Sequence, residues 1–158
     1  MTPDPVSVDE VCRYLESYAP ARLAEDWDNT GLLIGNMQGV VQQVMTCLTV
    51  TPETVKEAID RQVQLIVTHH PLPFRPLKTI TRSTIAGGMV LDLIEAGIAV
   101  YSPHTSFDSA AEGINQQLAE KLGLSQIVPL RPFDNDPDHL GAGRWGHLET
   151  AATLDQWV

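Results

Sequence analysis

The stretch LIVTHHP, residues 65–71, decides the fold together with IAVYSPHTSFD, residues 98–108. Each begins as an apolar run typical of a buried strand and ends in side chains that can bind a metal ion. Between them, apolar residues at helical spacing predict one helix over about 84–96, which is the crossover that two parallel strands need. Ligands of open α/β sheets bind at the carboxyl ends of such strands. We therefore expect a common site for four side chains: His69, His70, His104 and Asp108.

The rest of the chain predicts an α/β fold with a mostly parallel sheet and helical crossovers. An S-x-x-E capping box at Ser7 starts a helix over about 7–18, and Thr51-Pro52-Glu53 starts another over 52–62. The apolar run within residues 40–50 suits a strand that is buried on both faces. A second S-x-x-E pattern, which begins at Ser109, predicts one more helix before Gly123.

Length and composition predict one compact domain with an incomplete appendage. The chain has 158 residues, of which 43% are hydrophobic, and this is enough for a single core. We expect an α/β metal-site domain over residues 1–130. From Arg131 onward the composition shifts to Pro, Asp and Gly, so we interpret 131–158 as a connection and the start of a second half. A helical pattern from Thr153 to Val158 is cut short, which predicts that the sequence is part of a longer protein.

Charge and cysteine content exclude several classes of function. Ten basic residues against 20 acidic ones give a net charge of −10, so no nucleic-acid partner is expected, and anionic membranes are disfavoured for the same reason. No apolar run approaches the roughly 20 residues of a membrane span, and no signal sequence precedes the first helix. A cytoplasmic location is predicted. Cys12 and Cys47 are isolated, which favours reduced, buried thiols.

Neutral imidazoles with a carboxylate suit one or two divalent transition-metal ions, such as Zn, Fe, Mn, Co or Ni, better than Ca or Mg. Adjacent histidines of an extended segment point in opposite directions, so His69 and His70 would serve two ions, or one would support the other. Two plainer readings remain: Asp108 as a helix-start acid, and the histidines as polar ends of strands. The location of all of them at neighbouring strand ends favours the metal site.

Two further motifs carry weaker signals. GAGRWG, residues 141–146, matches G-x-G-x-x-G in letters, but no strand precedes it, so a flexible turn is the better interpretation than a dinucleotide site. The loop at Trp27 and Asn29 is predicted to shape the mouth of a pocket, or to be a turn whose tryptophan packs on the core.

Three motifs in order resemble one known family. They are A-P-x-x-L-A-E-x-W-D-N-x-G-L from Ala19 to Leu32, L-I-V-T-H-H-P from Leu65 to Pro71, and A-V-Y-S-x-H-T-x-x-D from Ala99 to Asp108. This combination resembles the Nif-three-like dinuclear metal-centre proteins, whose bacterial members are labelled GTP cyclohydrolase I type 2 homologues. The match covers roughly Ala19 to Leu124, and G-x-G-R-x-G-x-L at 141–148 looks like the family's entry into its second half.

The resemblance implies a two-metal centre with His69, His70, His104 and Asp108 as ligands, and a ring-shaped hexamer. Family members complete the centre with an H-x-x-x-E motif near the C-terminus, which these 158 residues lack. The chain also departs from the family at Thr49, where an acid is common. Two functions are expected from this: a metal-dependent hydrolase acting on a nucleotide or phosphoester, or a non-catalytic module that holds metal or a protein partner.

Overall fold

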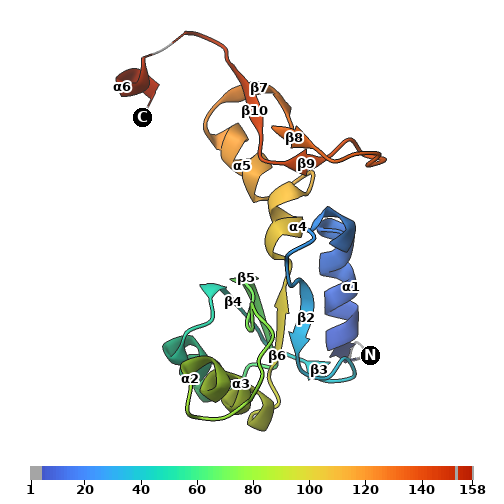
Figure 1. Cartoon of the computed structure of the whole chain (residues 1–158), viewed down its shortest axis with the longest axis vertical. Helices are drawn as coiled ribbons and strands as arrows, with labels where there is room; N and C mark the ends of the chain where they lie inside the picture. Colours follow the sequence, from blue (N-terminus) through green and yellow to red (C-terminus); the bar gives the residue numbers. More distant parts are fainter. Residues whose placement is uncertain (1–4, 152, 158) are drawn as a thin grey trace.

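The computed structural model describes residues 5–151 and 153–157. The helices and strands are arranged in two lobes (Figure 1). The first lobe contains the central sheet and three helices: α1 (Val8–Tyr18), α2 (Pro52–Asp60) and α3 (Ile85–Glu95). The second lobe contains α4 (His104–Ser109), α5 (Ile114–Lys121) and several short strands, and α6 (Leu154–Trp157) lies beyond it. Strand β6 (Ala99–Ser102) leads directly from the first lobe into α4.

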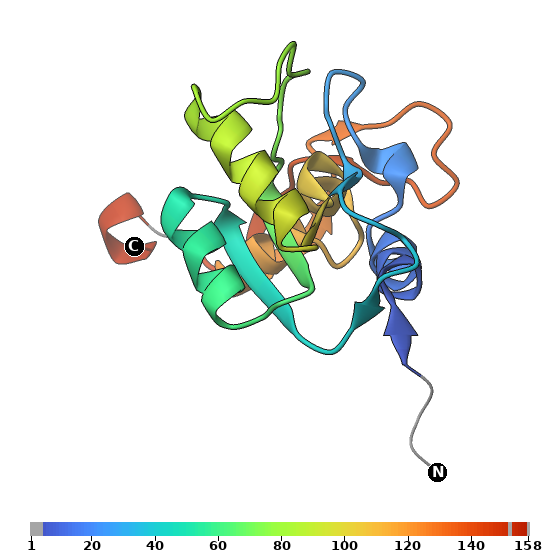
Figure 2. The same cartoon turned by 90° about the horizontal axis from the view of Figure 1, so that it is seen from below.

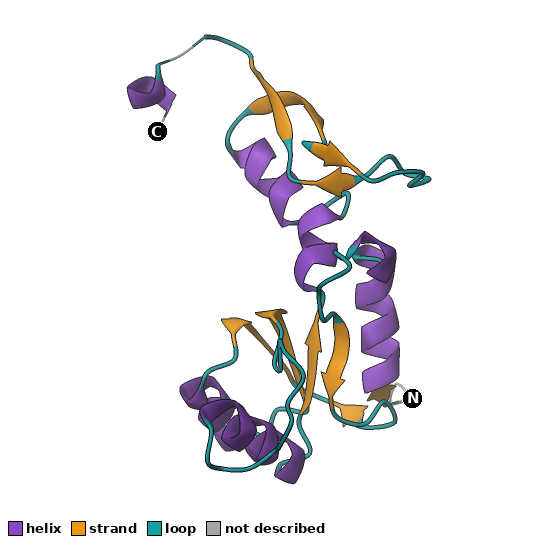
Figure 3. Cartoon of the chain, viewed as in Figure 1, coloured by secondary structure: helices purple, strands orange, loops and turns teal. Residues whose placement is uncertain are grey.

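The central sheet has four strands in the order β2-β6-β5-β4. Strands β4 (Val44–Thr49), β5 (Leu65–His70) and β6 are parallel, and α2 and α3 are the crossovers between them. Strand β2 (Gly31–Ile34) pairs antiparallel with β6 at one edge. The predicted α/β class with a mostly parallel sheet is confirmed (Figure 3). The antiparallel edge strand was not predicted, because its four-residue apolar run does not distinguish a strand from a buried turn of helix.

Helices cover both faces of this sheet, α1 on one side and α2 with α3 on the other (Figure 2). Alternate residues of β5 serve the two faces: Leu65 packs with Val8 of α1, and Ile66 packs with Leu93 of α3. All four side chains are 2% exposed or less. At about 25 cal/mol per Å² of apolar surface removed from water, such positions supply much of the stability of the lobe.

The predicted helix starts are confirmed where a capping side chain is present. Ser7 accepts a hydrogen bond from the backbone of Glu10, and the Glu10 carboxylate accepts one in return. Thr51 caps α2 and Thr84 caps α3, each by accepting one hydrogen bond from the backbone of the third residue after it. The capping box predicted at Ser109 is wrong: Ser109 ends α4, and α5 begins after Gly113 with no side-chain cap.

Short antiparallel pairs of strands lie outside the central sheet, two of them in the second lobe. Strand β7 (Leu124–Val128) pairs with β10 (Trp145–Leu148), and β8 (Arg131–Pro132) pairs with β9 (Gly141–Ala142). A further pair, β1 (Val6–Ser7) with β3 (Val40–Val41), lies beside α1. The boundary expected at residue 130 stays a prediction, and it falls between the paired strands β7 and β10. Of the helix expected over 153–158, α6 covers Leu154–Trp157, and Val158 lies outside the described residues.

No helix within residues 5–151 and 153–157 has both the length and the apolar character that crossing a bilayer requires. Both cysteines are free thiols, as predicted, but both are only partly buried, so the predicted full burial is wrong. Burial is the main reason that the pKa of Cys12 rises to about 11, and Asp9 and Glu16 add to it. The raised pKa favours the protonated thiol, which is the less nucleophilic form, at neutral pH.

Asp136 organises the loop between β8 and β9. Its buried carboxylate accepts hydrogen bonds from the backbone of Leu140 and Asp138 at 2.9 and 3.1 Å, and from Arg22 Nε at 3.1 Å. The hydrogen bond from the Leu140 backbone is the first cause that holds the pKa of Asp136 below its usual value, with the Asp138 backbone and Arg22 contributing.

We expect Asp136→Asn to lower the free energy of unfolding by about 1–2 kcal/mol at pH 7, because the charged contact to Arg22 is lost. A carboxylate with a lowered pKa in the folded protein stabilises above its unfolded pKa of about 3.9, and this contribution disappears as the pH falls through the folded value. The gap between variant and parent should therefore close below about pH 4 in urea titrations. Asp138→Asn, at a more exposed partner of Arg22, should change stability by less than about 0.5 kcal/mol and serves as control.

Candidate metal centre

Three imidazoles gather at the carboxyl ends of β5 and β6. His69 and His70 are the last two residues of β5. His104 is the first residue of α4, and only Pro103 separates it from the end of β6. The ring centroid of His104 lies 5.1 Å from that of His69 and 6.0 Å from that of His70, and the two adjacent histidines are 5.1 Å apart. The structure therefore brings the predicted histidines together at one edge of the sheet, and both rings of the β5 pair approach His104.

The backbone of His104 is held in an unusual conformation, with φ at 32°. This region costs a non-glycine residue energy and persists where the surroundings impose it. The side chain of His104 makes a hydrogen bond of 2.7 Å between its Nδ1 and Asp28 Oδ1. A carboxylate only accepts, so Nδ1 carries the proton, and Nε2 of the neutral ring is left with a free lone pair.

Asp28 is a residue of this site that sequence reasoning missed. Its side chain is fully buried, and it also accepts hydrogen bonds from the Thr105 backbone at 3.1 Å, from the Thr105 hydroxyl and from the Asn29 backbone at 2.7 Å. Burial raises the pKa of Asp28, but the hydrogen bonds from Thr105, His104 and Asn29 outweigh it and leave the pKa below its usual value. Asp28 is therefore a carboxylate that orients His104, in the manner of the outer partners of metal-binding histidines.

His70 has a neutral partner instead. The Thr49 hydroxyl lies 2.6 Å from His70 Nδ1, and the two residues are paired across β4 and β5. A hydroxyl both donates and accepts, so this contact does not fix which ring nitrogen of His70 carries the proton. An acid, Asp28, therefore positions His104, whereas the Thr49 hydroxyl positions His70. Residue 49 is the position where the family resemblance leads us to expect an acid.

His69 has a nitrogen with no partner. Its Nδ1 is buried and makes no hydrogen bond within the described part of the chain, while Nε2 lies 3.7 Å from Asp108 Oδ1. Burial is the main reason that the pKa of His69 falls below its usual value; Asp108 opposes the shift, and His104 and His70 add to it. Burial likewise raises the pKa of Asp108, against the effect of His69 and His104. A neutral imidazole with an unsatisfied buried nitrogen fits a role in binding an ion.

Asp108 follows His104 by four residues on α4 and approaches His69 from that helix. The four predicted ligands are thus neighbours, and their chemistry suits divalent transition metals. They do not converge on one point: within residues 5–151 and 153–157, no three His, Cys, Asp or Glu side chains are arranged to hold a single ion. The donor set fits a metal, whereas the arrangement is that of an open site with too few ligands in place.

The predicted pocket residues flank this cluster. Trp27 lines a cavity of about 370 Å³ together with His70, Pro71, Phe74 and His104. Asn29 does not line it; its side-chain amide donates to the Pro73 carbonyl at 2.6 Å and ties the two loops of the cavity together. Phe74 was missed in the sequence, because prolines on both sides of it indicated only an irregular loop.

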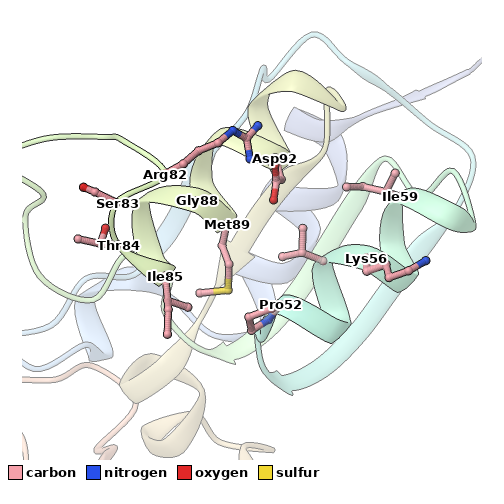
Figure 4. Close-up of a pocket in the computed structure, with 11 residues that line it drawn as sticks. Pro52, Lys56, Ile59, Arg82, Ser83, Thr84, Ile85, Gly88, Met89 and Asp92 are labelled. Carbon is pink, nitrogen blue, oxygen red and sulfur yellow. Dashed lines mark hydrogen bonds and ion pairs between the residues drawn. The ribbon is translucent and has the colours of Figure 1, made fainter.

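Other hollows lie away from the histidines. A groove of about 590 Å³ runs between α2 and α3, with Lys56, Ile59 and Met89 in its walls (Figure 4). Arg82, at its rim, is paired with Asp92 and Glu95. A second hollow of about 620 Å³ is lined mainly by apolar residues such as Leu33, Leu77 and Ile80. Neither contains a residue of the histidine cluster, and neither gathers groups for acid–base or metal chemistry.

Several known proteins are similar to this chain in sequence and in fold. The chain is 35% identical to the GTP cyclohydrolase 1 type 2 homolog of Clostridium acetobutylicum over 151 residues, which are 96% of this chain and 56% of that protein. Among solved structures, the Bacillus cereus protein related to NIF3 superposes with a TM-score of 0.77 at 38% identity, over 83% of this chain and 36% of that one. Reduced HcgD from Methanocaldococcus jannaschii superposes with a TM-score of 0.79 at 32% identity, over 89% and 54%.

The chain spans about half the length of the curated relatives it matches. The sequence model of the Duf34/NIF3 (NGG1p interacting factor 3) family covers residues 6–158, which is nearly all of it. This chain belongs to the Duf34/NIF3 family.

Proposed function

We propose that this chain binds one or two divalent transition-metal ions at His69, His70, His104 and Asp108, and that it acts as part of a metal-dependent hydrolase for a nucleotide or phosphoester. The observation that carries the proposal is the pattern of ring nitrogens. Asp28 leaves His104 Nε2 free, and His69 Nδ1 is buried without a partner. The name of the Clostridium relative points to nucleotide chemistry, and fold alone does not fix the reaction.

The residues of the chain have distinct tasks in this proposal. The three imidazoles and Asp108 supply ligands, Asp28 holds His104 in its tautomer and orientation, and Thr49 supports His70. An ion bound there would supply Lewis acidity and a water of lowered pKa. Because the described ligands are too few to enclose an ion, we expect modest affinity and coordination positions left open to water or substrate.

Metal binding is tested on the whole chain after chelation and dialysis. Zn²⁺, Mn²⁺, Fe²⁺, Co²⁺ and Ni²⁺ are titrated by calorimetry, bound metal is measured by elemental analysis, and turnover of GTP and of a nitrophenyl phosphodiester is followed. We expect His104→Ala to lose metal and His147→Ala, at a histidine outside the cluster, to retain it. Equal metal content in the two variants would contradict the site, and bound metal without turnover would contradict the hydrolase.

One observation favours a second function, a non-catalytic module that holds metal or a partner. Asp28, the buried acid nearest the cluster, is engaged in four hydrogen bonds and is not free to move a proton. In that case chelation should lower the melting temperature, since a ligand that binds only the folded state stabilises it, and there should be no activity to lose. A melt that is unchanged by chelation would count against a module that holds metal.

Assembly and location remain proposals. We propose a homo-oligomer, with the hexamer implied by the family resemblance, in the cytoplasm and without a nucleic-acid partner. The net charge of −10 supports the last point. Sedimentation velocity of the chain would test the assembly directly.

A further inference from the structure

Two exposed aromatic rings stand beside the histidine cluster. Trp27 is 62% exposed and Phe74 is 44% exposed. Their centroids are 6.2 Å apart in an edge-to-face arrangement, and each ring lies edge-on to His104, at 6.3 and 6.2 Å. Together with His70, Pro71 and His104 they line the open cavity of about 370 Å³. Its size is at the small end of the range for small-molecule sites.

The loops that carry the two rings are fixed to each other and to the cluster. Asn29, two residues after Trp27, donates from its side chain to Pro73, the residue before Phe74, at 2.6 Å. Asp28, between Trp27 and Asn29, is hydrogen-bonded to His104 at 2.7 Å. The loops that carry the aromatic rings are therefore held together before any ligand arrives, which reduces the entropy lost on binding.

The lining of the cavity selects for one kind of ligand. The described residues that line it include no lysine or arginine, the two positively charged side chains that commonly bind phosphate groups. Its surfaces are an indole, a phenyl ring and a proline, and its polar groups are the imidazoles of His70 and His104. Aromatic faces bind other planar rings by stacking, with little regard to their substituents.

We propose that Trp27 and Phe74 form a receptor for the planar heteroaromatic ring of a small molecule, such as a nucleobase, and present its edge to His70 and His104. Recognition then begins with the ring, and a phosphate group of the same molecule is not what the cavity binds. This inference rests on the proposed function only for what happens after binding, because the aromatic rings are in place without metal.

The test measures binding of guanosine and of ribose 5-phosphate to the whole chain, with and without Zn²⁺, by calorimetry and saturation-transfer NMR. Guanosine supplies the ring without phosphate, and ribose 5-phosphate supplies phosphate without a ring. Trp27→Ala and Phe74→Ala should each weaken guanosine binding at least about fivefold, as expected for the loss of a stacking partner. Trp145→Ala is the matched control, since Trp145 is 45% exposed and lies edge-on to His147 at 5.4 Å, far from the cavity in sequence.

Guanosine binding that Trp27→Ala weakens and Trp145→Ala leaves unchanged supports the inference, even if no metal binds and the proposed function fails. Metal binding with guanosine affinity unaltered by Trp27→Ala overturns the inference and leaves the metal site intact. Tighter binding of ribose 5-phosphate than of guanosine in the absence of Zn²⁺ also overturns it. Sedimentation velocity of Trp27→Ala tests the alternative that a second copy of the chain, and not a small molecule, packs on these rings. A smaller assembly than that of the parent would show this and would overturn the inference as well.

Discussion

Asp28→Asn is expected to weaken metal binding by about 10–100-fold while leaving the chain folded. Asparagine has the shape of aspartate but replaces one acceptor oxygen with a donor. If the amide takes the place of Oδ1, it faces the Asn29 N–H and forces His104 Nδ1 to accept, so that the proton moves to Nε2 and blocks that nitrogen as a ligand. If it takes the place of Oδ2, it faces the N–H of Thr105. The first orientation changes the proton position on His104, and the second repels the backbone of the residue that follows it.

Two measurements separate this prediction from simple loss of structure. Calorimetric titration gives the change in dissociation constant, and long-range ¹H–¹⁵N correlation spectra report which nitrogen of His104 carries the proton in the absence of metal. Thr49→Val is the matched variant, since it removes the partner of His70 but leaves His104 untouched; its effect should be smaller. Equal affinities for Asp28→Asn and the parent, with an unchanged His104 tautomer, would show that Asp28 does not position this ligand.

Asp28 and Thr49, the partners of His104 and His70, show which parts of the site could be predicted from the sequence. The apolar runs that end at His70 and Ser102, with a helical pattern between them, were sufficient to predict parallel strands and the side chains at their ends. The role of Asp28 was not accessible in this way, because it depends on a contact between residues 76 positions apart. Only its place in the W-D-N motif marked it. Thr49 was noticed through the resemblance alone, and its contact with His70 needed the register of β4 and β5.

The wrong helix start at Ser109 has a comparable cause. The S-x-x-E pattern is local, whereas the true start is set by a close approach of two segments. A Cβ at Gly113 would lie 1.8 Å from the Phe107 carbonyl oxygen, so only glycine permits α5 to begin there against the end of α4. Ser109 itself is buried, with an exposure of 1%, and its carbonyl accepts a hydrogen bond from Arg144. Tertiary contacts thus overrode a capping signal that was adequate at the N-terminus of α1.

Arg144 also explains the role of the G-x-G-R-x-G motif at residues 141–146. The turn joins β9 to β10 and leads into no helix, so it is not a dinucleotide loop. Nor is it merely flexible. All three guanidinium nitrogens of Arg144 donate hydrogen bonds, at 2.7 to 3.1 Å, to the carbonyls of Gly141, Gly143, Ser109 and Ala110 and to the Gln116 side chain. Burial lowers the pKa of Arg144, yet an arginine stays charged in a protein. The motif fastens the β9–β10 turn to the end of α4, the helix that carries His104 and Asp108.

Replacing Arg144 by Met is therefore expected to lower the free energy of unfolding by about 3 kcal/mol or more, because five hydrogen bonds from a charged donor are lost and carbonyls are left without partners. Arg144→Lys should recover only part of this loss. Lysine keeps the positive charge, but its ammonium group cannot reach the acceptors on both sides of the arginine side chain. Urea titrations at pH 7 give the values. Arg13→Met is the control: Arg13 pairs with Asp9 on the exposed face of α1, where such pairs contribute about 0.5 kcal/mol or less. Similar losses for Arg144→Met and Arg13→Met would mean that the turn is only a connection, and that α4 holds the candidate ligands in place without it.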